Sequence, residues 1–217
     1  MTYTVRRNNI EVAASHRFCN AAPVTIAIYY GMQSMFEGET HVLTPGGAYT
    51  DWTEAAKAST FTKQEYPLFR RYVEKNRQGY QSTWLLPDGL GDHALLDGQD
   101  DIFIYAPYGK SYHKLIGNKR MENGDKTCWR GVYTWFETPV ADDADLLCYE
   151  GSAGGHTAVF IDCKRACKRT LALPGYLDLR HFGAAEQNSG IRISAAGRNK
   201  LKIKADAPGS CVLLLRE

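Results

Sequence analysis

The sequence carries almost no excess charge of either sign. It has 26 Lys and Arg residues against 24 Asp and Glu residues, which gives a formal net charge of +2. A chain so nearly balanced lacks the long-range field that attracts nucleic acid or an anionic membrane. We therefore expect no specific nucleic-acid partner and no membrane, whereas weak self-repulsion favours association between copies of the chain.

Long hydrophobic runs are also missing. The opening MTYTVRRNNIEV has early arginines but no apolar segment of the kind that a secretory signal peptide needs. No stretch approaches the roughly 18 consecutive apolar residues of a transmembrane helix. These absences predict a protein of the cytoplasm of the producing or infected cell.

The six cysteines lie mostly in strand-like runs, where a free thiol acts as a small buried hydrophobe. A chain of this size and apolar content does not need a disulfide framework. The segment CKRACKR places Cys163 and Cys167 among four cations, which would lower a thiol pKa. A zinc site needs closer spacing and a second pair of ligands, so we interpret the segment as a solvated basic loop.

Motifs for nucleophilic or phosphate chemistry are absent. EGSAGGH, from Glu150 to His156, lacks the Lys-Ser or Lys-Thr pair of a phosphate loop and the spacing of a nucleophile elbow. It links two strand-like runs, so we predict a glycine turn with His156 opening the next strand. We expect no enzyme, no cofactor and no metal.

One alternative stays open in the acidic segment PDGLGDHALLDGQDD. Its carboxylates could ligate calcium, although the order does not fit an EF-hand loop and Asp and Gly are ordinary turn formers. The carboxylates concerned are Asp88, Asp92, Asp97, Asp100 and Asp101.

Period-two alternation between turn signals such as TPGG, ENGD and DAPGS recurs along the whole chain. It predicts an all-β fold, mainly β with one or two helices, built as one jelly-roll-like β-sandwich domain over residues 1–217. The expected strands are 2–6, 9–13, 24–30, 40–43, 80–86, 102–105, 111–116, 128–136, 145–149, 157–162, 190–194, 200–205 and 210–215.

A helical insertion is predicted near 51–77. Asp51 is a suitable N-cap residue with an acidic residue three positions on, and Gly79 follows a basic final turn. Further on, the last third of the chain is expected to form a meander that turns one apolar face to the core. That face would comprise Ile191, Ile193, Leu201, Ile203 and Val212.

Aromatic residues make up 12% of the chain. Adjacent pairs such as Tyr29 and Tyr30, or Trp135 and Phe136, must point to opposite sides of a strand, so one member of a pair is expected to leave the core. Outward Tyr and Trp side chains are typical of protein interfaces and sugar-binding faces. The candidate self-association surface comprises Tyr29, Tyr30, Trp52, Tyr66, Tyr72, Tyr105, Tyr108, Tyr112 and Trp135.

The stretch VTIAIYYGMQSMFEGETHVLTPGGAYTDWTEAAKAS, followed by YPLFRRYVEKNRQGYQ, reads as a strand ending in a Tyr pair, a turn, a strand and a helix. In this order of elements it resembles the β-sandwich polyhedrins of insect cypoviruses, which crystallise inside infected cells and encase virions. GVYTWFETPVADDADLLCYEG is similar to a later strand pair of that family. The resemblance covers less than half of the chain, lacks the family's long N-terminal helix, and transfers no functional residue.

From this pattern we expect a self-assembling structural protein, either a viral occlusion-body matrix of the polyhedrin type or a virion lattice component. Its partners would be copies of itself and virions. Three other functions stay open: a carbohydrate-binding, lectin-like β-sandwich, a phage decoration or tail protein, and a membrane-active β-sandwich toxin.

Overall fold

The computed structural model describes residues 1–35, 41–43, 49–51, 60–61, 70–76, 79–86, 101–105, 110–187 and 190–215. These residues form antiparallel strands almost throughout, and the only helical element among them is the 3-10 turn η3 (Leu179–His181). The all-β class is therefore confirmed, whereas the jelly-roll connectivity stays a prediction.

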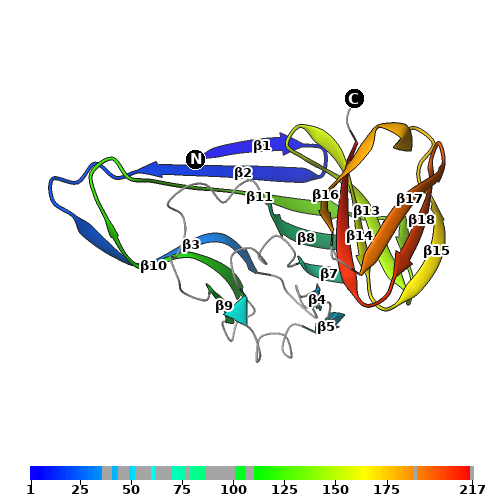
Figure 1. Ribbon diagram of the computed structural model, residues 1–217, viewed down its shortest axis with the longest axis horizontal. Helices are drawn as coiled ribbons and strands as arrows, with labels where there is room; N and C mark the ends of the chain where they lie inside the picture. The colour runs from blue at the N-terminus through cyan, green and yellow to red at the C-terminus, as the bar shows by residue number, and fades with distance from the viewer. Residues whose placement is uncertain are drawn as a thin grey trace.

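Two sheets are built from the first two thirds of the chain (Figure 1). The seven-stranded sheet contains, in spatial order, β1 (Thr2–Arg6), β2 (Asn9–Arg17), β11 (Lys126–Phe136), β8 (Gly79–Leu85), β7 (Arg70–Asn76), β4 (His41–Leu43) and β5 (Tyr49–Asp51). The four-stranded sheet contains β3 (Val24–Met35), β10 (Lys110–Met121), β9 (Asp101–Tyr105) and β6 (Thr60–Phe61).

The last third of the chain forms two further sheets at the other end of the molecule (Figure 1). The five-stranded sheet contains β12 (Ala141–Asp142), β13 (Leu146–Ala153), β14 (His156–Cys163), β19 (Gly209–Leu215) and β16 (Phe182–Gln187). The three-stranded sheet contains β15 (Cys167–Ala172), β18 (Lys200–Ala205) and β17 (Ile191–Gly197).

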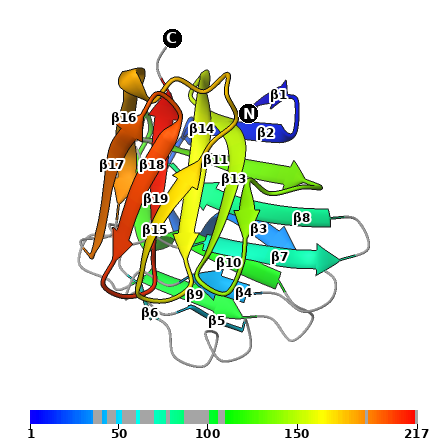
Figure 2. The same cartoon turned by 90° about the vertical axis from the view of Figure 1, so that its right-hand side faces the viewer.

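The five-stranded sheet is buried on both faces. One face carries Ile161 and Leu213 into a first core shared with Leu201 of the three-stranded sheet. The other face carries Phe160 into a second core shared with Trp84 of the seven-stranded sheet, whose strands run across it (Figure 2). A sheet covered on both sides has no solvated face, which explains the near-continuous apolar runs LLCY, AVFI and CVLLL.

The seven-stranded sheet is in turn covered on its far side. Val12, Leu85 and Trp129 form a third core with Met32 of β3 and Leu115 of β10. The four sheets therefore lie in sequence as four layers, with one core between each neighbouring pair.

This layering corrects one expectation about the meander. Ile191, Leu201 and Ile203 do share the first core, and Ile193 packs against it. Val212, however, lies in the second core. The expected single apolar face is wrong at this position, because β19 belongs to the sheet that is buried on both sides.

All thirteen expected strands are present, with bounds that differ by a few residues. The predicted helix is wrong wherever its residues are described: Asp51 ends β5, residues 60–61 form β6, and residues 70–76 form β7, which pairs with β4 and β8. Gly79 has the positive φ (+95°) expected after a helix, but it begins β8 and pairs with Asn76 of β7. A glycine with positive φ is suited both to the end of a helix and to a connection between strands, so this residue alone did not distinguish the two. Residues 52–59 and 62–69 of the predicted insertion lie outside the described residues.

The glycine turn in EGSAGGH is confirmed. Ala153 pairs with His156, which opens β14, and Gly154 and Gly155 between them have φ values of +59° and +86°. Two consecutive residues of positive φ are the conformation of a two-residue turn that matches the twist of an antiparallel hairpin. The glycines therefore serve backbone geometry.

We expect Gly155→Ala to lower the free energy of unfolding by about 1–2 kcal/mol, because an L residue with a side chain is strained at this φ. Urea denaturation measures the loss. Gly175→Ala is the matched control, since a Cβ at Gly175 meets nothing within 4 Å and its φ is not positive. Equal stability of the two variants would contradict the turn assignment.

Candidate interaction surfaces

The structure describes the side chains of three of the nine aromatic residues in the predicted surface, namely Tyr29, Tyr30 and Trp135. Tyr29 packs against the third core, where its hydroxyl accepts a hydrogen bond from Trp129 Nε1 at 3.0 Å. Burial raises the pKa of Tyr29. Tyr30 and Trp135 are half-buried, and the Trp135 ring stacks on Tyr133.

The other six members are described only in part or not at all. The backbones of Tyr72, Tyr105 and Tyr112 lie in β7, β9 and β10. Trp52, Tyr66 and Tyr108 lie outside the described residues. The structure thus brings Tyr29 inward and gathers no outward aromatic cluster from the side chains it describes.

Two of the exposed large apolar side chains, Tyr3 and Val5, lie on β1, which forms one edge of the seven-stranded sheet. All five residues of β1 are exposed, so both of its faces are open. The relative exposures of Tyr3 and Val5 are 62% and 70%, and Met1 precedes them at 67%. An exposed edge with apolar side chains is a template for pairing with another strand.

A second surface is the outer side of the three-stranded sheet. On its central strand β18 the alternate, outward residues are all lysines, whereas the inward ones pack in the first core. We call it the basic sheet face, and it comprises Lys168, Arg192, Lys200, Lys202 and Lys204. The interpretation of CKRACKR as a solvated loop is therefore wrong from Cys167 onward, because β15 begins there.

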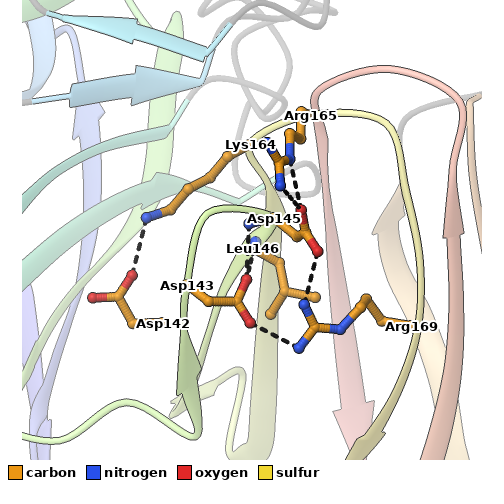
Figure 3. Close-up of polar contacts among 7 residues, drawn as sticks. All are labelled: Asp142, Asp143, Asp145, Leu146, Lys164, Arg165 and Arg169. Carbon is orange, nitrogen blue, oxygen red and sulfur yellow. Dashed lines mark hydrogen bonds and ion pairs between the residues drawn. The ribbon is translucent and has the colours of Figure 1, made fainter.

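A cluster of opposite charges fixes the corner between β12 and β13 against the start of β15 (Figure 3). The Arg169 guanidinium bridges two carboxylates, at 2.8 Å from Asp143 Oδ2 and 2.8 Å from Asp145 Oδ2. Arg165 reaches the other oxygen of Asp145 at 2.6 Å. The two arginines hold a turn that would otherwise concentrate negative charge.

These contacts lower the pKa of both carboxyl groups. For Asp145 the hydrogen bonds from Arg169 and Arg165 are the main cause. For Asp143 partial burial acts to raise the pKa, but the backbone N–H groups of Asp145 and Leu146 and the Arg169 guanidinium together outweigh it. Both carboxylates are therefore ionised at neutral pH.

A neighbouring pair connects the five-stranded sheet to the seven-stranded sheet. Lys164 Nζ lies 2.9 Å from Asp142 Oδ1, and both side chains are largely buried. Tyr80 of β8 donates a hydrogen bond to Asp142 Oδ2 at 2.7 Å, and Lys164 Nζ lies 5.6 Å from the centre of the Tyr49 ring. The charges are thus compensated where the two sheets meet.

All six cysteines are free thiols. Burial raises the pKa of Cys163 and of Cys167, so the expected lowering by neighbouring cations is wrong. Cys148 and Cys211 are buried in the same first core. These four thiols therefore act as apolar side chains of the first core, whereas Cys19 is exposed and Cys128 is half-buried.

Among the described residues, no three His, Cys, Asp or Glu side chains are grouped to hold a metal ion. The acidic segment that could ligate calcium lies outside the described residues, apart from Asp101 at the start of β9.

His113 is buried, and burial lowers its pKa to about 4 despite its contact with the Met32 carbonyl, so its ring is neutral at pH 7.

A small cleft lies beside the turn that joins β1 and β2. Tyr176 and Pro174 form one wall, and Phe136 and Pro139 are among its other lining residues. Glu150 accepts a short hydrogen bond from the Tyr176 hydroxyl, and Arg7 Nη1 lies 3.6 Å from Glu150 Oε1. Arg7 has a positive φ of 46°, which is unusual for a residue with a side chain.

No protein-family model, curated protein or solved structure matches the chain. The similarity to cypovirus polyhedrins therefore stays a prediction. Over the part of the chain that the structure describes, there is no helix with the length and apolar content to span a membrane.

Sequence reasoning missed the basic sheet face, although a signal was present. Lysine alternates with apolar residues in KLKIK, at positions 200–204. Between positions 163 and 205 the sequence has ten Lys or Arg residues and two acidic residues. The near-zero net charge of the whole chain concealed this local excess.

We expect Arg169→Gln to lower the urea midpoint at pH 7, because it removes the cation shared by Asp143 and Asp145. Carboxyl groups with a lowered pKa stabilise the fold above their usual pKa of about 3.9, and this stabilisation is lost as the pH falls through the lowered value. The difference from the wild type should therefore shrink at pH 3 and below. Lys168→Gln, on the same strand without an ion pair, is the control and should match the wild type at pH 7. A pH-independent difference would show that Arg169 acts through packing alone.

Proposed function

We propose that the chain is a non-enzymatic structural protein that assembles with copies of itself through β1. The observation that carries this proposal is the exposure of all five β1 residues on a free sheet edge. Within the described residues β1 pairs with β2 alone. Its apolar side chains therefore contribute nothing to the cores and are available to a partner.

The pairing register defines which backbone groups point outward. Arg6 pairs with Asn9 across a two-residue turn, so the Arg6 carbonyl accepts from the Asn9 N–H. Because hydrogen-bonded positions alternate along an antiparallel pair, Thr4 and Thr2 also face β2. The N–H and C=O groups of Tyr3 and Val5 then point to the open edge.

Exposed apolar residues elsewhere support an association that extends beyond pairs. Val24 and Ile28 of β3 are 39% and 51% exposed, on a different sheet from β1. A contact between two unlike surfaces can propagate from copy to copy instead of closing into a dimer, and a lattice forms where such contacts combine in more than one direction. A viral occlusion-body matrix or virion lattice is the finer form of this proposal.

A matched pair of variants tests the edge. Val5→Ala and Val5→Pro both lose the apolar side chain, but only the proline variant loses the outward N–H. Proline is tolerated at such an edge position, so the monomer should fold. We expect the proline variant to associate about ten-fold more weakly than the alanine variant, since the lost hydrogen bond and the unpaired partner carbonyl cost about 1 kcal/mol or more.

Light scattering and sedimentation, from micromolar to millimolar protein, measure the association. Circular dichroism checks that both variants fold. A wild-type chain that stays monomeric over the whole range, or equal association of the two variants, would refute the proposal.

The cleft beside Arg7 favours carbohydrate binding as a second function. The Tyr176 side chain is 66% exposed next to a carboxylate and a guanidinium, and rings beside polar groups of this kind suit sugar binding. Tyr176→Ala should abolish any glycan binding, whereas Tyr3→Ala, with 62% exposure at another site, should leave it intact. A glycan array with the wild type and both variants checks this, and an array without hits would remove the candidate.

A further inference from the structure

The basic sheet face presents its cations in a regular grid. Opposite residues of an antiparallel pair share a face, and Lys204 of the central strand lies between Lys168 of β15 and Arg192 of β17. Lys202 and Lys200 continue along the central strand. With neighbouring strands about 4.8 Å apart and a rise of about 3.3 Å per residue, the grid measures about 10 by 13 Å.

Most of this charge is not compensated. Asp206 lies 3.3 Å from Lys204 and 3.6 Å from Arg192. Among the described residues, no carboxylate forms an ion pair with Lys168, Lys200 or Lys202. Five exposed cations therefore face the solvent with one carboxylate beside them, although the chain as a whole has a charge of only +2.

Short hydroxyl side chains lie between the lysines. Thr170 and Ser194 are the cross-strand neighbours of Lys202, and both are exposed. A shallow groove runs over this part of the face, lined by these residues together with Lys168 and Lys204. Lysine and hydroxyl donors along a groove are the groups that contact phosphate oxygens in protein–DNA complexes.

The basic sheet face also lacks the side chains by which proteins bind single-stranded nucleic acid, sugars or lipid bilayers. None of the exposed large hydrophobic side chains of the described residues lies on β15, β17 or β18. Without an aromatic ring there is no stacking platform for unpaired bases or sugar rings. Without an exposed large apolar side chain there is no anchor for insertion into a bilayer. A duplex, whose bases are already stacked, needs neither.

We propose that the basic sheet face binds the phosphate backbone of double-stranded nucleic acid, independently of base sequence. A duplex carries one charge per about 1.7 Å of axis, so 13 Å of duplex carries about eight phosphates, of which those on the side that faces the sheet can contact the five cations. Such contacts typically give a Kd of about 10⁻⁴–10⁻⁶ M at physiological salt. With four or five cations engaged, log K should fall against log [salt] with a slope of about −4.

The test is fluorescence anisotropy with a labelled 20-base-pair duplex and the full chain in about 50–200 mM KCl. Lys168→Gln combined with Lys202→Gln removes two cations of the face that have no ion pair. The control combines Arg17→Gln with Lys126→Gln, an exposed cross-strand pair on β2 and β11 that forms no ion pair with any described carboxylate. We expect the first double variant to bind at least ten-fold more weakly with a slope reduced by about 2, and the control to bind within two-fold of the wild type.

Thermal melts of both double variants establish that they fold. The proposal is overturned if the wild type does not bind the duplex at the lowest salt, or if both double variants lose affinity equally. It is also overturned if a single strand, dextran sulfate or phosphatidylserine vesicles bind more tightly than the duplex at equal charge. The result does not depend on self-association, because Val5→Pro should bind the duplex as the wild type does when compared as a monomer.

Discussion

Burial of the five-stranded sheet on both faces is the constraint on which the rest of this structure depends. Its three inner strands, β13, β14 and β19, supply the largest share of the first and second cores, and both faces of the sheet are covered. The three-stranded and seven-stranded sheets must therefore cover it, so only their far sides and edges are available to contact a partner. The four-stranded sheet covers most of the far side of the seven-stranded sheet. On these two covering sheets, the edge at β1 and the outer side of the three-stranded sheet therefore remain exposed.

The two free surfaces have opposite chemistry. The β1 edge offers unpaired backbone groups with apolar side chains, which suit another strand. The basic sheet face offers charge without apolar area, which suits a hydrated polyanion. Charged pairs such as Asp142 with Lys164 lie where layers meet, where the carboxylate is hydrogen-bonded as well as paired. Charges are therefore paired where layers meet, whereas the cations on the outer side of the three-stranded sheet are largely uncompensated.

Local patterning was sufficient to predict thirteen of the strands, because period-two alternation and turn residues act over a few neighbours, but it missed β12, β15 and β16. It failed at β7, where RRYVEKN has good helix formers but pairs with β4 and β8 on either side. Tertiary pairing overrides propensity in such short segments. Strand order is set by contacts between residues far apart in the chain, so the layers, and with them the side on which Val212 lies, could not be predicted.

The candidate interaction surfaces could likewise be predicted only in part from local sequence. Residue type alone predicted that the aromatic side chains lie outward. Tyr29 instead accepts a hydrogen bond from Trp129 in the third core, because β3 folds back over β11. The exposure of β1 follows from its place at the end of the strand order, which a sequence does not display. The lysines of β18 are different, since the alternation in KLKIK was sufficient to place them on one side of a strand.

The position of β19 in the chain has a consequence for synthesis. This strand pairs with β14 on one side and β16 on the other, and it contributes to both inner cores. It leaves the ribosome after every other described strand. Until it emerges, β14 presents an open, apolar edge, so the most hydrophobic layer of the nascent chain is incomplete and its exposed edge is prone to aggregation.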